Sequence, residues 1–383
     1  MDITVSFTAT TIFQSEGNSE NPVERFNVSF EDIIENGVEI EMRTLKPMMP
    51  LLGRVAIGME MYFKPIVTLL GIGLNGLVVF LLRTPELKAI SISSYYIAVG
   101  VSDMIFLGTS FVMWTRKVGF NALLFNGLCQ ILMYLTYMSY FISTWLLLSP
   151  VIQRVVILCN TDLEVKKASV VIGFVTSLAI LFYSYILWTF GVYDAHMGLV
   201  CAPREQYRDL TETLFKIDTI ANALIPVVLT LFFLAVFISA MIWRKYKQRK
   251  CVRKTPVRLE DYGFSNDSGT RECMETLIFI LLVTTTSYIM TLPAAIERLK
   301  FFFYGPAGRS TITINDIWRN EIFLNVQLTS FSTKLGACMY FRRFRRVLCR
   351  YLKRCFKRKD DDMETGSIEE LAHMTIPNLP TPT

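Results

Sequence analysis

The chain has 383 residues, a formal net charge of +6 at pH 7 and a hydrophobic content of 52%. Its mean hydropathy of +0.39 is too high for an ordinary soluble domain of this length. The composition therefore excludes that class and indicates a membrane protein.

An acidic segment with little hydrophobic patterning comes first, and we expect residues 1–61 to form an extracellular N-terminal tail. Within it, the triplet NVS at Asn27 is a sequon for N-linked glycosylation. A chance triplet is the alternative interpretation of this sequon.

Six segments then match membrane-spanning helices, because a run of about 20 mostly apolar residues crosses the roughly 30 Å hydrocarbon core as a helix. They are residues 62–83, 91–114, 126–153, 168–191, 217–243 and 274–297. A seventh segment, residues 322–341, is more polar and contains Lys334. Hydropathy alone leaves this segment open.

The charge distribution favours a seventh helix. Lys and Arg tend to stay on the cytoplasmic side of a membrane, which places both basic clusters, residues 244–254 and 341–359, in the cytoplasm. The C-terminal cluster then lies opposite the acidic tail, so the number of crossings is odd. The sequence predicts an all-α membrane protein: a seven-transmembrane helix bundle in the plasma membrane, with an extracellular N-terminus and a cytoplasmic C-terminus.

The cysteine positions agree with this orientation. Of the eight cysteines, only Cys129 and Cys201 fall on the outer side, where an oxidising environment favours pairing. We expect a disulfide between them that fixes the top of the third helix to the loop after the fourth. Two unpaired thiols at the membrane edge are the alternative.

After the seven-transmembrane domain at residues 62–341, we expect an amphipathic membrane-surface helix at residues 342–357 and a cytoplasmic tail at residues 358–383. Apolar side chains lie largely on one face of this helix, with arginines and lysines around them: Phe341, Phe344, Leu348, Tyr351, Leu352 and Phe356. Such a helix lies in the interface of an anionic lipid bilayer. Cys349 and Cys355 lie where palmitoyl chains would anchor it, plain thiols being the alternative.

Polar residues inside the spans resemble those of the rhodopsin-like G-protein-coupled receptors. Asn75, in GIGLNGLVVFLL, resembles the asparagine of that family's first helix, and Asp103, in IAVGVSDMIFLG, resembles the aspartate of its second. Arg154 follows Cys129 by 25 residues, which is the spacing of the family's cytoplasmic arginine. The loose form of these motifs is most similar to neuropeptide receptors of the family.

Two prolines extend the resemblance, since Pro226 and Pro293 match those of the family's fifth and sixth helices, and FRRFRRVL resembles the short helix after the seventh. A proline inside a helix removes a hydrogen bond and bends it, so we expect kinks at both positions. The resemblance implies that these helices move outward on activation and open a cleft where Arg154 contacts a heterotrimeric G protein. It also implies arrestin as a further partner, with no nucleic acid and no cofactor. The charged and aromatic side chains at the outer ends of the helices favour an extracellular peptide ligand, and the lack of paired catalytic groups inside the spans argues against an enzyme.

Several residues depart from the family pattern. Gln153 replaces the acid that normally precedes the cytoplasmic arginine, and a neutral contact restrains Arg154 more weakly than a charged one. The hypothesis that follows is raised basal activity, or another contact that holds Arg154. Pro150 should bend the third helix one turn above, and Ser287 and Thr291 replace the aromatic switch of the sixth.

Lys334 is the largest departure, because alignment on Phe344 places it at the position of the seventh helix's usual proline. A charged carboxylate within the membrane must face the bundle interior, unless it is held neutral there, and Asp103 should lie at similar depth. We expect an Asp103–Lys334 ion pair in a core polar network with Asn75, in place of the sodium ion that many relatives hold. The alternative is a Lys334 side chain that reaches the cytoplasmic interface.

The expected ligand pocket combines charged and aromatic side chains, a mixture suited to the polar ends and aromatic groups of a peptide. Its candidate residues are Thr136, Tyr137, Tyr134, Glu297 and Arg298. The outer ends of the helices also carry Arg116, Lys117, Lys216, Asp218 and Lys300. A solvated rim is the alternative, and no metal-binding set is expected.

Other functional classes fit less well. Lys334 is about two helical turns too close to the cytoplasm to hold retinal as in opsins, and Thr136 stands where an amine receptor needs an acid. A transporter or channel would be expected to show repeats, broken spans or several intramembrane charges. A seven-helix membrane protein of another class, a transporter or a non-signalling receptor-like protein, is the alternative to a receptor.

Overall fold

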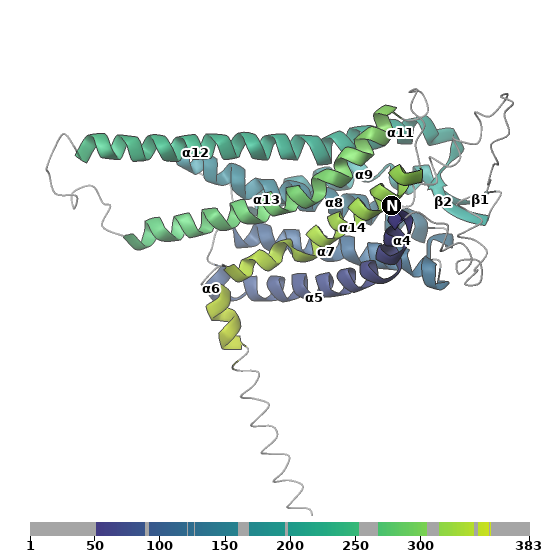
Figure 1. The fold of residues 1–383 in the computed structure, drawn as a ribbon, viewed down its shortest axis with the longest axis horizontal. Helices are drawn as coiled ribbons and strands as arrows, with labels where there is room; N and C mark the ends of the chain where they lie inside the picture. The colour runs from purple at the N-terminus through teal and green to yellow at the C-terminus, as the bar shows by residue number, and fades with distance from the viewer. Residues whose placement is uncertain are drawn as a thin grey trace, which may run out of the picture.

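A computed structural model (Figure 1) gives the arrangement of ten stretches of the chain. It describes residues 51–88, 92–120, 122–125, 127–159, 168–195, 198–252, 267–304, 314–340, 344–351 and 353. Its first half contains α4 (Leu51–Gly58), the π-helical turn η1 (Met59–Phe63), α5 (Lys64–Leu82), α6 (Pro85–Lys88), α7 (Ser93–Trp114), the 3-10 turns η2 (Thr115–Val118) and η3 (Ala122–Leu124), α8 (Leu128–Cys159), α9 (Ala168–Tyr183) and α10 (Ile186–Thr189).

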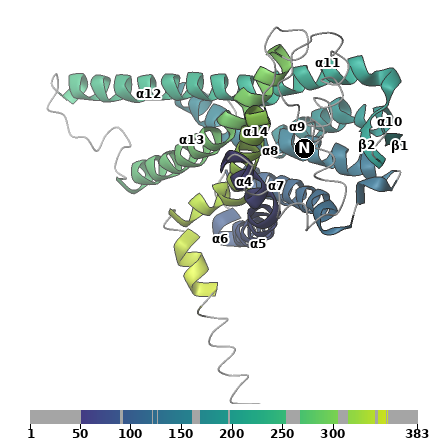
Figure 2. The ribbon, with the colours of Figure 1, turned by 45° about the vertical axis from the view of Figure 1, so that its right-hand side comes forward.

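The second half begins with a hairpin and continues with the longest helices. It contains β1 (Phe190–Ala195), β2 (Gly198–Pro203), the 3-10 turn η4 (Glu205–Tyr207), α11 (Arg208–Thr219), the π-helical turn η5 (Ile220–Leu224), α12 (Ile225–Val252), α13 (Asp267–Tyr304), α14 (Ile314–Thr333) and the 3-10 stretch η7 (Lys334–Tyr340). Residues 344–351 are again helical. Figures 1 and 2 show α12 and α13 extending past the other helices at the end opposite the hairpin.

Six helical stretches within the described ranges are long and apolar enough to cross a membrane. They are Leu51–Leu82, Ser93–Val118, Leu128–Gln153, Ala168–Thr189, Glu205–Val236 and Phe279–Lys300. The six clear sequence predictions are thereby confirmed as apolar helices, and the fold is compatible with an all-α, multi-pass membrane protein.

The predicted seventh helix is present as α14, continued by η7, but it is not one of these six apolar stretches. It packs against α13 on one side and α5 on the other, so it belongs to the same bundle. Five of its polar side chains are buried in that bundle: Asn320, Asn325, Gln327, Ser330 and Ser332. Because these groups face neighbouring helices, they lower the hydropathy of α14 without being exposed at its outer surface.

Several boundaries differ from the predictions. The first helical stretch begins at Leu51, inside the segment that we expected to be a tail up to residue 61. The fifth begins at Arg208 rather than at residue 217, and α13 starts at Asp267 rather than at residue 274. Hydropathy marks only the apolar part of a helix, whereas backbone hydrogen bonds carry it on through polar turns.

Two π-helical turns lie just before prolines in the bundle. The first, η1, comes directly before Pro65 at the start of α5, and the second, η5, precedes Pro226 at the start of α12. Proline has no N–H to donate to the carbonyl one turn back, and a wider turn accommodates the missing bond. Pro150 and Pro293 instead lie inside the continuous helices α8 and α13, where bends stay a prediction.

The close packing of α5 against α14 and α7 depends on a glycine. A Cβ atom at Gly71 would lie 2.6 Å from Ser332 Cβ and 2.8 Å from Leu107 Cδ1, whereas one at Gly73 would have no neighbour within 4 Å. The lack of a side chain at Gly71 therefore lets the three helices approach one another.

Gly71→Ala should lower the free energy of unfolding by about 1–3 kcal/mol, because both neighbours belong to packed helices and must move. Gly73→Ala is the matched control on the same helix, and it should be neutral or stabilising, since alanine favours helices over glycine. The thermal unfolding midpoint of each purified variant in detergent gives the comparison. Equal midpoints for the two variants would contradict the close-packing explanation.

Candidate functional site

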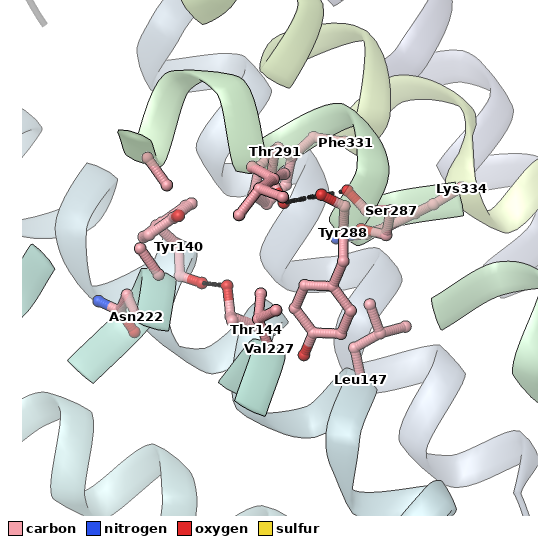
Figure 3. A pocket seen from close by; sticks show the side chains of 13 residues that line it. Tyr140, Thr144, Leu147, Asn222, Val227, Ser287, Tyr288, Thr291, Phe331 and Lys334 are labelled. Atoms are coloured by element: carbon pink, nitrogen blue, oxygen red, sulfur yellow. Dashed lines mark hydrogen bonds between the residues drawn. The ribbon is translucent and has the colours of Figure 1, made fainter. Parts of the chain in front are cut away.

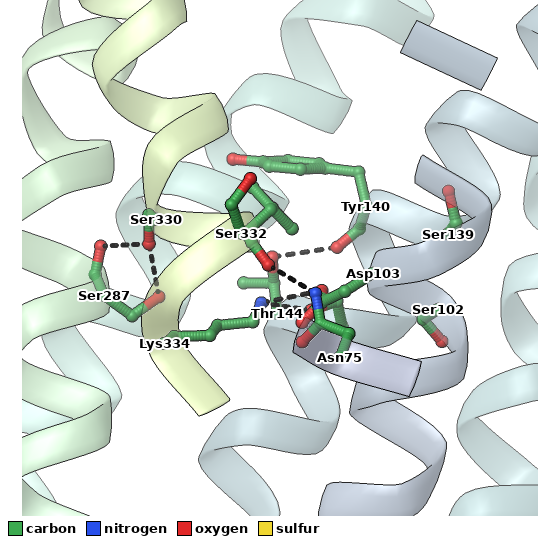
Figure 4. Close-up of polar contacts among 12 residues, drawn as sticks. Asn75, Ser102, Asp103, Ser139, Tyr140, Thr144, Ser287, Ser330, Ser332 and Lys334 are labelled. Atoms are coloured by element: carbon green, nitrogen blue, oxygen red, sulfur yellow. Dashed lines mark hydrogen bonds and ion pairs between the residues drawn. The ribbon is translucent and has the colours of Figure 1, made fainter. Parts of the chain in front are cut away.

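A buried ion pair lies at the centre of the bundle (Figure 4). Lys334 Nζ is 2.9 Å from Asp103 Oδ1, and the two side chains are 2% and 0% exposed. Ser143 of α8 joins them, since its Oγ accepts a hydrogen bond from Lys334 at 2.5 Å and donates one to Asp103 Oδ1 at 2.6 Å. The structure thus contains the expected pair, and the Lys334 side chain is buried rather than extended to the surface of the bundle. One salt bridge and two hydrogen bonds tie α7, α8 and η7 together.

The local backbone holds Lys334 in this position. It is the first residue of η7, where the helix tightens from α to 3-10 geometry, and its ammonium group lies 4.1 Å from the centroid of the Phe331 ring. Asn75 Nδ2 donates to the Phe331 carbonyl at 3.0 Å, and Ser332 Oγ donates to the Val67 carbonyl at 3.0 Å. Two side chain to backbone bonds therefore attach the end of α14 to α5, next to the ion pair.

The sodium ion implied by the family resemblance does not fit this carboxylate. The Lys334 ammonium already contacts Asp103 Oδ1 and Ser143 Oγ, so a second cation would meet a like charge there. Two acceptors nearby, Asp103 Oδ2 and Asn75 Oδ1, are buried without a hydrogen-bond partner among the described residues. Buried acceptors of this kind usually bind an ordered water molecule.

A second buried polar cluster joins α9 to α11 and η5. Asp218 accepts hydrogen bonds from the Tyr183 hydroxyl and from Asn222 Nδ2, the latter at 2.7 Å, and Asn222 also donates to Tyr183 at 2.9 Å. The Tyr137 ring stacks against those of Tyr183 and Phe215, with centroids 6.1 and 5.2 Å apart. Asp218, which the sequence analysis assigned to the outer end of its helix, is 4% exposed, so it does not belong to a solvated rim.

The predicted pocket residues of α13 point to different neighbours. Arg298 Nη2 donates to Gln327 Oε1 at 2.9 Å, and its guanidinium carbon lies 5.8 Å from the centroid of the Tyr140 ring. Glu297 instead forms ion pairs with Arg319 at 2.9 Å and with Lys300 at 3.0 Å. Arg298 therefore faces the bundle interior, whereas Glu297 connects α13 to α14.

The other predicted pocket residues take part in internal packing. Thr136 is buried and donates to Thr109 Oγ1 at 2.9 Å and to the Leu132 carbonyl at 2.7 Å. Tyr134 is partly buried against the main hydrophobic core. Of the five candidates, Tyr137 lies next to the second polar cluster through Tyr183, and Arg298 lies over the Tyr140 ring.

A small cavity lies between the two polar clusters (Figure 3). Side chains from α8, η5, α12, α13, α14 and η7 line it, among them Tyr140, Asn222, Tyr288, Thr291, Phe331 and Lys334. It has room for about one water molecule. Because Lys334 belongs to the central ion pair and Asn222 to the second cluster, the cavity connects the two.

A disulfide fixes the β1–β2 hairpin to the end of α8. Cys129, at the start of α8, is bonded to Cys201 in β2, with a Cα–Cα distance of 5.9 Å. Gln130 Nε2 also donates to the Phe190 carbonyl at 3.3 Å, and Tyr193 Oη donates to the Pro203 carbonyl at 2.6 Å. The cysteine pairing expected from the sequence is thus present, although the hairpin itself was not predicted.

At the other end of the bundle, residues 344–351 form a helix that packs on α5 and α6. Phe344 and Val347 are buried, and Arg350 forms an ion pair with Glu86 of α6 at 2.6 Å. This confirms an amphipathic helix over the described part of the predicted range. Cys349 is exposed and free, which is compatible both with palmitoylation and with a plain thiol.

Several predicted sites are not tested by the structure. Arg154 belongs to α8, but its side chain lies outside the described part of the structure. The preceding Gln153 has a buried Oε1 without a hydrogen-bond partner among described groups. Asn27 and Cys355 lie outside the described residues altogether.

Sequence reasoning missed Ser143, although it is the residue that connects the ion pair to α8. Thr136, Ser139 and Ser143 recur at helical spacing of three and four residues, and this polar stripe was the available signal. A comparison with models of known protein families found no match, and a comparison with curated protein sequences found none either.

Proposed function

We propose that the chain is a rhodopsin-like G-protein-coupled receptor that binds an extracellular neuropeptide. In this proposal, α14 with η7 is the seventh crossing of the plasma membrane, and the N-terminus is extracellular. The ligand acts on the outer half of the bundle. A heterotrimeric G protein binds in a cytoplasmic cleft between α8, α12 and α13, where Arg154 contacts it, and arrestin binds the phosphorylated tail.

The observation that carries the proposal is the buried Asp103–Lys334 pair, held by Ser143 between three helices. Ionisable groups at this depth are costly and mark function more often than structure. The pair depends on the position of η7, so a small displacement of α14 would separate the charges. A ligand that moves the outer half of α14 would thereby change the inner half.

The second polar cluster, formed by Tyr183, Asp218 and Asn222, supports signalling from the outer half of the bundle to the inner half. It lies beside Tyr137 on α8 and is connected to Lys334 through the cavity between the helices. The disulfide holds the hairpin next to the same end of α8. A ligand bound there would contact α8, α11 and α13, the helices whose continuations form the proposed cleft.

The test is expression in cells with a promiscuous G protein and a calcium readout against a neuropeptide library. We expect a specific nanomolar response, and its loss in Arg154→Ala at equal surface display. Arg83→Ala, which changes an exposed arginine after α5, is the matched control and should respond as the wild type does. Silence of a wild-type protein that reaches the surface would sink the proposal in favour of a transporter or a non-signalling protein.

Gln153 gives a second test of the proposal. Introducing the carboxylate with Gln153→Glu should lower ligand-free signalling, because a charge-assisted bond to the adjacent Arg154 is about twice as strong as a neutral one. Gln153→Ala, which adds no charge, should leave signalling at the wild-type level or raise it. Ligand-free output is measured at matched surface expression, and equal output from wild type and Gln153→Glu would argue against restraint at this position.

A further inference from the structure

Two charged side chains in the outer half of the bundle have no direct ion-pair partner among the described residues, and they attract each other only over a longer distance. Asp218 is 4% exposed, and its hydrogen-bond donors, Tyr183 and Asn222, are both neutral. Arg298 is partly buried and donates to the neutral Gln327. Neither takes part in any of the ion pairs between described groups.

The neighbouring Glu297 shows how a structural carboxylate is satisfied in the same region. Arg319 binds both of its oxygens, at 2.9 and 3.2 Å, and Lys300 binds Oε1 at 3.0 Å. Burying a charge costs free energy unless a partner compensates it. Folding alone therefore explains Glu297. Asp218 and Arg298 instead attract each other only at longer range and have no bonded counter-charge, and such groups concentrate at functional sites.

Asp218 and Arg298 face one region of the interior. Both act electrostatically on Tyr137, whose ring stacks on that of Tyr183. Asn222, which is bonded to Asp218, and Tyr140, which lies beneath Arg298, line the same cavity, and Figure 3 shows them on neighbouring parts of its wall. A negative and a positive site thus flank a wall of tyrosine rings.

Building on the receptor function proposed above, we infer that the ligand carries a basic and an acidic group together, the basic group bound by Asp218 and the acidic group by Arg298. A peptide with a lysine or arginine side chain and a free C-terminal carboxylate has this chemistry. The tyrosine rings between the two sites provide an apolar wall for the part of the ligand that joins its charges. Because the cavity holds about one water molecule, binding displaces Arg298 from Gln327 rather than filling an open pocket.

The first experiment needs no ligand. Asp218→Asn and Arg298→Gln each remove a charge that has no direct ion-pair partner, so the thermal unfolding midpoint of the purified, ligand-free protein should stay unchanged or rise by about 2–4 °C. Glu297→Gln is the control, and its midpoint should fall, because it weakens a satisfied pair. If Asp218→Asn and Arg298→Gln lower the midpoint as much as Glu297→Gln does, both charges are structural and the inference is overturned.

The second experiment uses defined probes. A synthetic peptide library is prepared with one lysine per peptide and a free C-terminal carboxylate, and again with the carboxylate amidated or with the lysine replaced by glutamine. Thermal shift of the purified protein should detect binding by the first form alone. Binding by that form should weaken roughly 10- to 100-fold in Asp218→Asn and in Arg298→Gln.

The outcomes separate the ligand class from the receptor function. If the amidated peptides, or those with glutamine in place of lysine, bind as well as the parent peptides, the inference is overturned. It is also overturned if no peptide stabilises the protein. Thermal shift requires no G protein, so charge-dependent binding without a calcium response would contradict the receptor function alone. A calcium response whose potency is the same in wild type and in both variants would contradict the ligand class alone.

Discussion

Replacing Lys334 with alanine is expected to lower the free energy of unfolding by about 3–5 kcal/mol, because it leaves Asp103 charged and buried without a counter-charge. Asp103 is 0% exposed, and after the substitution the Ser143 hydroxyl would remain as its hydrogen-bond donor among the described side chains. A single neutral hydrogen bond does not compensate a carboxylate at this depth. The loss should appear as reduced surface expression and as a lower unfolding midpoint of the purified protein.

The double variant Asp103→Asn/Lys334→Met separates the ion pair from other effects of Lys334. It removes both charges and keeps much of the side-chain volume, so expression and midpoint should partly recover relative to Lys334→Ala. Lys300→Ala is the control for loss of a lysine, because its side chain is 51% exposed in its pair with Glu297 and exposed pairs contribute at most about 1 kcal/mol. If neither surface expression nor the unfolding midpoint recovers in the double variant, the loss in Lys334→Ala does not come from an unpaired Asp103.

Physical constraint explains why this pair was predictable from the sequence. Charged groups are rare inside a membrane span and need a partner there. One aspartate and one lysine at similar depth are therefore expected to pair with each other. Ser143 was not predictable in the same way. Helical serines commonly bond the carbonyl one turn back, as Ser149 does with Trp145 at 3.0 Å, so a serine in a span carries little information about its neighbours.

The position of Asp218 shows what sequence reasoning left undecided. The sequence placed the charged positions 216 and 218 at the outer end of the helix, with a pocket and a solvated rim as alternatives. The structure continues the helix back to Arg208, and side chains of α9 and η5 surround Asp218. The packing of the whole bundle decides which face of a helix meets its neighbours. The hydropathy of a short segment carries no information about that packing.

Backbone features were the least predictable part of the fold. The η1 and η5 turns, the β1–β2 hairpin and the 3-10 geometry that begins at Lys334 all depend on hydrogen bonds between backbone groups. Side-chain patterns report such bonds only indirectly. The 3-10 stretch nevertheless matters for the ion pair, because it begins at Lys334, whose ammonium group contacts Asp103.

Loss of the disulfide should lower the free energy of unfolding about as much as loss of the ion pair does. Cys129 and Cys201 are 72 residues apart in the sequence, and closing a loop of that length removes conformational freedom from the unfolded chain, a stabilisation of about 4 kcal/mol in the chain-entropy model. Cys129→Ser or Cys201→Ser should therefore strongly reduce surface expression. A protein that still folds would have its hairpin held to α8 by the Gln130–Phe190 hydrogen bond at 3.3 Å and by packing.

Reduction of the purified protein provides the matched measurement. A reducing agent should lower the unfolding midpoint of the wild type and leave that of Cys201→Ser unchanged, because the variant has no bridge to break. Cys349→Ser, which changes an exposed free thiol, should respond to the reductant as the wild type does. A wild-type midpoint that is insensitive to complete reduction of the bridge would show that the hairpin is held by its packing, and that the covalent link contributes little to stability.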